Sequence, residues 1–270
     1  MTQTPIHRDN HYVPCVYLKQ WASSCGRVWT YRLLVSHPKV PLWKLSSPRG
    51  VAYHKHLYTQ VVAGEETDEI ERWLDSEFEA PVEEALQKAT SDARLTPEDW
   101  KRLVRFLASQ DVRTPAWFAE QAKRWHATLP NFIESTLRDS VRKREDAART
   151  GQPLPKMKPV KDNDLPLRVI TKRGSGQEMG QVGAEILVGR KLWLWSIKRA
   201  LKKTLKALYQ HRWTILLPPE GLNWFTTDNP VVRLNFSSVN NYNFGGGWGS
   251  PGTEIFLPLS PQHLIPNCEL

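Results

Sequence analysis

The chain has 270 residues, of which 40% are hydrophobic, and it carries a formal net charge of +9. This length and composition allow a packed core in one large domain or in two small ones. The sequence has no run of about 18 apolar residues, which argues against a membrane-spanning helix and a membrane partner. The excess of positive charge favours an anionic partner.

The N-terminal residues and the cysteines bear on the compartment. Residues 1–9 are polar, so a secretory signal is not expected. The three cysteines, Cys15, Cys25 and Cys268, are odd in number and lack the spacing of a zinc site. The simplest expectation is therefore the reduced cytoplasm.

Hydrophobic periodicity organises the first half of the chain. Residues 28–32 read as a short strand after a turn signal. Residues 68–88 have the spacing of an amphipathic helix, which Pro81 should kink or divide. T-P-E-D at residues 96–99 is a strong helix start, with Thr96 as the N-cap, proline in the first position and acids in the first turn.

Two long polar residues lie near the end of this second helix. Gln110 continues its apolar face three residues after Leu107, and Arg113 follows three residues later. We therefore expect both side chains to point toward the interior, which is unusual for such residues. Thr114 and Pro115 can cap the next helix.

The second half alternates between helical and extended patterns. Helices are predicted at residues 117–128, 131–148 and 179–209, with an exposed linker at 150–164. Strands are predicted at 212–217, 222–226 and 254–259, with a flexible glycine-rich loop at 240–252. The expected fold class is α+β, a predominantly helical single domain over residues 7–265. Its one small, mostly antiparallel sheet is expected to be formed by N- and C-terminal strands.

Three polar residues are candidates for a catalytic site. His11 can transfer protons near neutral pH, and Arg113 can bind phosphate or carboxylate. Asp228 follows a predicted strand, and it can act as a base, orient His11 or hold a divalent metal ion. If the three converge, the set suits phosphodiester chemistry. The cofactor is otherwise unknown.

Each candidate also has a structural interpretation. His11 can simply be bonded to backbone, and Arg113 can form an ion pair or bond the carbonyls at the helix end. Asp228 can make a tight turn.

Further residues support these candidates or extend them. Tyr12 would hold His11 in place, Gln110 would orient a ligand or bond the turn backbone, and Asn229 would add an amide beside Asp228. Glu69 and Glu77 are further candidates for metal ligands, although a solvated acidic helix face explains them more simply.

Charge is distributed unevenly along the chain. Residues 65–84 contain ten acids and one base, whereas residues 190–212 contain eight bases and no acid. The two segments can face each other or different partners. A tryptophan among lysines can stack on a nucleobase while the lysines contact phosphates, or it can be buried beside a solvated basic face. The candidate nucleic-acid contacts are Lys191, Trp195, Lys198, Arg199, Lys202, Lys203 and Lys206.

Short motifs along nearly the whole chain occur in the order of a known family. They are H-Y-V-P-x-x-Y-L at 11–18, L-Y-T at 57–59, an acidic amphipathic helix near 66–86, Q-x-x-R-T-P at 110–115, T-D-N-P-V at 227–231 and P-L-S-P at 258–261. With these motifs the chain resembles domain-of-unknown-function family 4238, a bacterial group. The family often has His-His at residues 10–11 and Ser-Asp at residues 227–228. The resemblance implies a shared fold and no particular reaction.

Three functional hypotheses follow from these patterns. The first is a nuclease-like hydrolase that acts on RNA or single-stranded DNA. The second is a non-catalytic module that binds nucleic acid or an acidic protein partner. The third is an enzyme for a small anionic substrate, which would use Arg113 without the basic helix.

Overall fold

A computed structural model describes residues 6–34, 37–62, 64–153, 165–172 and 181–268. The chain forms two compact units. Unit 1 comprises Met1–Trp117 and Ala200–Leu270, and unit 2 comprises Phe118–Arg199. Residues 154–164 of the predicted linker lie outside the described residues.

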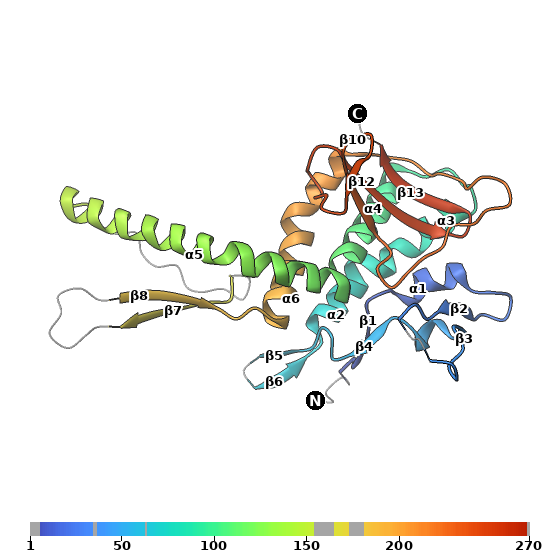
Figure 1. Ribbon diagram of the computed structural model, residues 1–270, viewed down its shortest axis with the longest axis horizontal. Helices are drawn as coiled ribbons and strands as arrows, with labels where there is room; N and C mark the ends of the chain where they lie inside the picture. The colour runs from blue at the N-terminus through green and yellow to red at the C-terminus, as the bar shows by residue number, and fades with distance from the viewer. Residues whose placement is uncertain (1–5, 35–36, 63, 154–164, 173–180, 269–270) are drawn as a thin grey trace. The chain divides into compact units, whose positions relative to one another are not determined.

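The N-terminal part of unit 1 consists of short antiparallel strand pairs (Figure 1). β1 (Asp9–His11) pairs with β4 (Tyr53–Lys55), β2 (Val28–Tyr31) pairs with β3 (Trp43–Ser46), and β5 (Gln60–Val62) pairs with β6 (Glu65–Thr67). Three short helical segments connect them: α1 (Cys15–Leu18), η1 (Lys19–Trp21) and η2 (Pro48–Gly50). β2 agrees with the strand predicted at residues 28–32.

The acidic segment is helical but divided, as its proline predicts. It contains α2 (Glu69–Leu74), the π-helical η3 (Asp75–Glu79), the 3-10 turn η4 (Ala80–Val82) and α3 (Glu83–Thr90). Pro81 lies in η4, where its missing N–H interrupts the regular hydrogen bonds. The apolar side of the segment contributes Ile70, Leu74 and Leu86 to the core.

The long helix α4 (Pro97–Val112) begins at the predicted N-cap. Thr96 Oγ1 accepts a hydrogen bond from the Asp99 backbone N–H at 3.2 Å, and Asp99 Oδ2 accepts one from the Thr96 N–H at 2.9 Å. This reciprocal capping box satisfies two N–H groups at the helix start. Leu103, Phe106 and Leu107 on its apolar face are buried.

The C-terminal part of unit 1 is a five-stranded antiparallel sheet in the order β11-β10-β12-β13-β9. Its strands are β9 (Arg212–Trp213), β10 (Val232–Ser238), β11 (Asn241–Asn243), β12 (Thr253–Ser260) and β13 (His263–Cys268). The predicted loop at 240–252 therefore includes one edge strand. The loop ends at Gly252, which has a φ of +71°. A Cβ at this position would clash with the Phe236 carbonyl, so only glycine fits.

The prediction of a single sheet formed by both ends of the chain is wrong. Among the described residues the strands form five separate sheets, and β1 pairs with β4 instead of a C-terminal strand. Both edges of β12 are already occupied by β10 and β13. The chain ends meet through side chains instead, since the Tyr17 hydroxyl lies 2.7 Å from both Thr226 Oγ1 and the Pro258 carbonyl.

The strands predicted on either side of residues 218–221 are also shorter than expected. β9 covers only two residues, and Leu216 adds an isolated bridge to Leu264. Residues 222–226 are not a strand, although the Trp224 N–H donates to the Pro261 carbonyl at 2.8 Å. Pro218 and Pro219 lack the N–H that a ladder requires, which explains why pairing stops there.

Most of α5 and all of β7, β8 and α6 form unit 2. α5 (Pro115–Thr150) is one continuous helix and not the two predicted, and Pro130 lies inside it. Its neighbours are solvent-exposed, so the carbonyl that loses its partner can be hydrated. β7 (Leu167–Lys172) pairs with β8 (Gln181–Ile186).

The helix predicted at 179–209 begins only at α6 (Arg190–Arg199), because the preceding residues form β8. The helical path continues into unit 1 as the π-helical η5 (Ala200–Thr204) and the 3-10 helix η6 (Leu205–Gln210). Leu194, Ile197, Leu201, Leu205 and Leu208, which recur at helical spacing along these segments, are buried. No helix among the described residues is long and apolar enough to cross a membrane.

Candidate functional site

Arg113 is fully buried at the C-terminal end of α4 and joins three segments of unit 1. Its Nη1 donates to Glu79 Oε1 at 2.5 Å, and its Nη2 donates to the His11 carbonyl. Its Nε donates to the Tyr58 hydroxyl at 3.4 Å, and that hydroxyl donates to the Arg113 carbonyl at 2.7 Å. Arg113 therefore binds the N-terminal strand, the segment after β4 and the acidic helical segment together.

The ionic surroundings keep Arg113 charged. Burial acts to lower the pKa of Arg113, but Glu79, followed by Tyr58 and Glu71, outweighs it and raises the pKa above its usual value. Burial likewise raises the pKa of the Tyr58 phenol, against the opposing effect of Arg113. The guanidinium is thus a permanent charge with protein partners on all three of its nitrogens.

The T-D-N-P turn lies next to the start of α5. Thr114 Oγ1 donates to Asn229 Oδ1 at 2.8 Å, and the same oxygen accepts the Trp117 N–H at 3.2 Å. Thr114 therefore caps α5 as predicted and also holds Asn229 in place. Asp228 is exposed, and its charge together with burial raises the pKa of the Tyr12 phenol, with burial the larger cause.

The segments that carry His11, Arg113 and Asp228 do come together, but their side chains have different partners. The His11 ring lies with Nε2 3.2 Å from the Arg49 carbonyl and packs 5.6 Å from the Tyr53 ring. Arg113 contacts the backbone of His11, not its ring. Proton transfer by His11 and catalysis by Asp228 stay predictions.

Gln110 is fully buried, as predicted. Among the described residues, neither its amide nitrogen nor its amide oxygen has a hydrogen-bond partner. A buried, unsatisfied amide costs free energy of folding, so Gln110 lowers the stability of the protein one turn before Arg113.

Glu71 is a titratable residue that the sequence reasoning missed. It is half-buried in α2, and burial raises its pKa from 4.5 to about 7. Arg113 opposes this effect, whereas Glu79, Asp75 and Asp68 add to it. Its Oε2 has no hydrogen-bond partner among the described residues. One sequence feature could have indicated its burial, namely its position next to the buried Ile70, at the border of the apolar face of the helix.

A metal site is not evident in the part of the chain that the structure describes, where no three His, Cys, Asp or Glu residues lie close enough to hold an ion. Glu77, predicted as a possible ligand, accepts a hydrogen bond from Arg105 instead. Glu69 is exposed in the first turn of α2.

The seven predicted nucleic-acid contacts divide between the two units. In unit 2, Lys191 is exposed, Lys198 and Trp195 are half-buried, and the Arg199 guanidinium lies 5.5 Å above the Trp195 ring. In unit 1, Lys202, Lys203 and Lys206 are exposed. All of these cations except Lys198 are therefore exposed, and the role of the set in binding stays a prediction.

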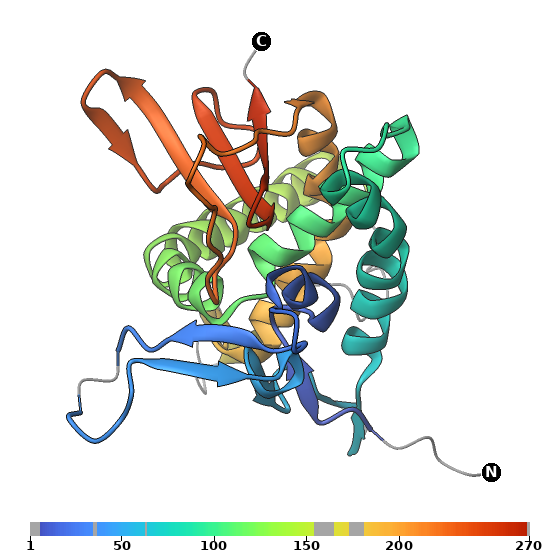
Figure 2. The same cartoon turned by 90° about the vertical axis from the view of Figure 1, so that its right-hand side faces the viewer.

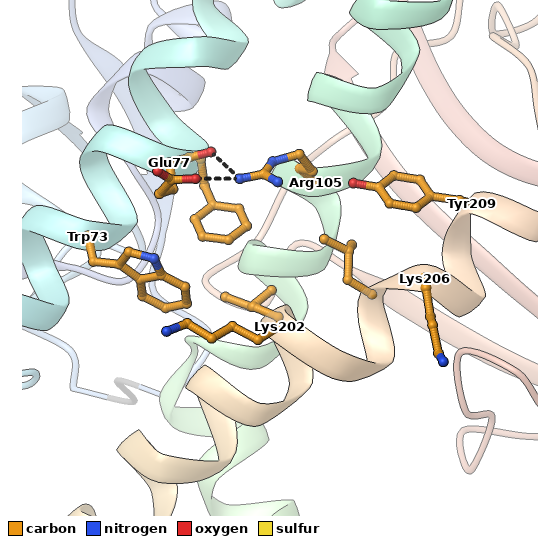
Figure 3. A pocket seen from close by; sticks show the side chains of 9 residues that line it. Trp73, Glu77, Arg105, Lys202, Lys206 and Tyr209 are labelled. Carbon is orange, nitrogen blue, oxygen red and sulfur yellow. Dashed lines mark hydrogen bonds and ion pairs between the residues drawn. The ribbon is translucent and has the colours of Figure 1, made fainter. Parts of the chain in front are cut away.

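Two of the unit 1 lysines line a groove of about 340 Å³ (Figure 3). The groove lies between the acidic segment, α4 and the η5–η6 segment. It is lined by Trp73, Glu77, Phe78, Arg105, Leu201, Lys202, Leu205, Lys206 and Tyr209. Its three cations and one carboxylate leave an excess of two positive charges.

The groove is ordered by side-chain contacts among its lining residues. Arg105 Nη2 donates to Glu77 Oε2 at 2.8 Å, and its guanidinium lies 4.9 Å from the centre of the Phe78 ring. The Lys202 ammonium lies 5.6 Å from the centre of the Trp73 ring. Figure 3 shows the Tyr209 hydroxyl pointing toward Arg105, so aromatic rings and cations lie close to one another in the groove.

Residues 9–266 match the model of a family described as "Protein of unknown function (DUF4238)". The chain belongs to this family. This confirms the resemblance identified from the sequence motifs. Comparisons with curated proteins and with solved structures found no match.

Membership of DUF4238 assigns no reaction, so function has to be argued from the geometry. The sequence reasoning had singled out Lys202 and Lys206 but not Trp73, Arg105 or Tyr209. These three come from separate segments, and only tertiary packing brings them to one groove.

Proposed function

We propose that this protein binds single-stranded nucleic acid in the groove between the acidic segment, α4 and the η5–η6 segment. One observation carries the proposal: cations and aromatic rings line the same concave surface of unit 1. Phosphates would contact Lys202 and Lys206, which are exposed, and nucleobases would stack on Tyr209 and on the accessible part of Trp73.

The groove fits a single strand better than a duplex. Base stacking needs an accessible ring face, and in a duplex the bases are already stacked on one another. The aromatic rings also favour nucleic acid over an acidic protein. Lysines alone can bind the carboxylates of a protein, whereas the rings offer stacking surfaces for nucleobases. The net charge of +9 adds long-range attraction for a polyanion.

Binding is supported better than hydrolysis. The guanidinium of Arg113 is fully buried and donates to Glu79, Tyr58 and His11, so its donors are not available to a phosphate. The same hydrogen bonds to Glu79, Tyr58 and His11 also argue against a small anionic substrate bound by Arg113. Cleavage of the bound strand stays a prediction, which a denaturing gel of the incubated oligonucleotide can test.

The test is fluorescence anisotropy of the full-length protein with labelled single-stranded RNA, single-stranded DNA and duplex DNA. We expect tighter binding of the single strands, and Lys202→Ala/Lys206→Ala should weaken it by at least about tenfold through the lost phosphate contacts. The matched control is Arg94→Ala/Lys101→Ala, which removes two exposed positive charges outside the groove.

Three results would contradict the proposal. One is the absence of oligonucleotide binding. Another is an equal loss of affinity in the control variant, which would indicate a nonspecific charge effect. The third is stronger binding of polyglutamate than of oligonucleotide at the same salt concentration, which would indicate an acidic protein partner. Shortened oligonucleotides on a denaturing gel would instead add hydrolysis to binding.

A further inference from the structure

The β2–β3 hairpin of unit 1 exposes an unusual amount of apolar surface. Trp29 and Tyr31 are two residues apart in β2 and therefore lie on the same face of the strand. Tyr31 is directly opposite Trp43, and their rings lie 5.0 Å apart in an edge arrangement. Trp29 and Trp43 are 60% and 57% exposed, so this aromatic face has no cover within the described structure.

Exposure is greatest just beyond the end of β2. Leu33 and Leu34 follow the strand, with 82% and 95% of their surface accessible. Leu42, which precedes β3, is also exposed. Figure 2 shows the hairpin, in blue, extending away from the helices of unit 1. Several large apolar side chains exposed on one hairpin are typical of an interaction site.

Charge identifies the kind of partner. Residues 10–64 contain no aspartate or glutamate and seven lysines and arginines. Four of these bases, Arg27, Arg32, Lys39 and Lys44, lie in the hairpin or next to it, and all but the half-buried Arg32 are exposed. The partner therefore has to offer both negative charge and an apolar interior.

We propose that the β2–β3 hairpin docks on the surface of an anionic phospholipid bilayer, with Leu33 and Leu34 entering the acyl region. Trp29, Tyr31 and Trp43 would lie at the level of the headgroups, where amphipathic aromatic rings are favoured. The surrounding bases would contact the anionic headgroups.

A nucleic acid fits this surface less well. The aromatic face and the bases suit single strands, but fully exposed leucines gain nothing from bases or phosphates. A second copy of the chain would bring two basic hairpins together, which electrostatic repulsion disfavours. The expectation of no membrane partner rested on the lack of a spanning segment, and surface docking does not need one.

The experiment is flotation of the full-length protein with vesicles of phosphatidylcholine alone and with added phosphatidylglycerol. We expect binding to the anionic vesicles, and Leu33→Ser/Leu34→Ser should reduce the partition coefficient by more than about tenfold, since two leucine side chains no longer leave water. The matched control Leu222→Ser/Phe225→Ser removes two apolar side chains exposed elsewhere in unit 1 and should bind as the wild type does. Thermal unfolding would verify that both variants fold.

The proposal is independent of the groove, so Lys202→Ala/Lys206→Ala should keep vesicle binding. It is overturned if the wild type ignores anionic vesicles, or if the leucine variant binds them as well as the wild type. Loss of oligonucleotide binding in the leucine variant, with vesicle binding unchanged, would reassign the hairpin to nucleic acid. A dimer that the leucine substitutions dissociate would reassign it to contact between two copies.

Discussion

Unit 1 contains two trios of the same kind, each made of an arginine, a glutamate and an aromatic ring, in two different environments. At the end of α4, Arg113 pairs with Glu79 at 2.5 Å and lies 5.6 Å from the Tyr58 ring. Two turns earlier, Arg105 pairs with Glu77 at 2.8 Å and lies 4.9 Å from the Phe78 ring. The Arg113 side chain is 0% exposed, whereas that of Arg105 is 32% exposed.

The difference in exposure separates a structural role from a binding role. A buried guanidinium has lost its water, so its protein partners are essential and unavailable to a ligand. A surface guanidinium exchanges partners at little cost. Arg113 of the Q-x-x-R-T-P segment therefore serves the fold, whereas Arg105, which belongs to no motif, lines the groove.

Replacing Arg113 should have the largest effect. Arg113→Met keeps much of the volume but leaves Glu79 and the His11 carbonyl without their donor. We expect a loss of about 3–5 kcal/mol in the free energy of unfolding, measured by urea denaturation. Near-native stability combined with lost oligonucleotide binding would reverse the assignment and make Arg113 a ligand-binding residue.

The titration of Glu71 provides a pH-dependent test of the buried surroundings of Arg113. Its pKa is raised from 4.5 to about 7, so the folded state binds the proton more tightly than the unfolded state does. The stability from this group is complete below pH 4.5, is lost as the pH rises to about 7, and stays lost above it. Glu71→Gln should remove this slope and stabilise the protein at pH 8 by about 1–3 kcal/mol.

Denaturation curves between pH 5 and pH 8 would measure the effect, with the same substitution at the exposed Glu69 of α2, Glu69→Gln, as the matched control. A wild type whose stability rises across this range, with the same slope in Glu71→Gln, would show that Glu71 does not titrate there.

Replacing Arg105 should have the smallest effect on stability. Its ion pair with Glu77 is partly solvated, so Arg105→Ala should change the free energy of unfolding by no more than about 1 kcal/mol. Its oligonucleotide affinity should nevertheless fall, because a groove cation is lost. If Arg105→Ala destabilised the protein as much as Arg113→Met, the contrast between the two trios would fail.

Local signals in the sequence predicted local structure well. The N-cap at Thr96, the interruption at Pro81 and the burial of Gln110 and Arg113 all depend on residues within a few positions of one another. The pairing of strands could not be predicted from such local signals, because β1 pairs with β4 and not with a C-terminal strand. Which strands pair depends on which edges of the C-terminal sheet are already occupied, and the hydrophobic periodicity of one segment does not show this.

The candidate site illustrates the same limit. The motifs marked segments that the fold brings together, because Arg113 contacts the His11 carbonyl and its neighbour Thr114 contacts Asn229. They did not indicate the partners of each side chain. Glu71 and Glu79 are two of the ten acids in residues 65–84, and the sequence does not distinguish the buried acids from the exposed ones. The groove combines Trp73, Arg105 and Tyr209 from three segments, and their meeting depends on how the helices pack.

The most direct measurement is the salt dependence of single-stranded oligonucleotide binding by the wild type and by Lys202→Ala/Lys206→Ala. Each phosphate contact on a single strand contributes about 0.7 to the slope of log K against log salt concentration, so losing two lysines should reduce the slope by about 1.4. A reduced slope in this variant, with the wild-type slope retained in Arg94→Ala/Lys101→Ala, is the predicted result. An unchanged slope would contradict the assignment of the groove as the nucleic-acid site.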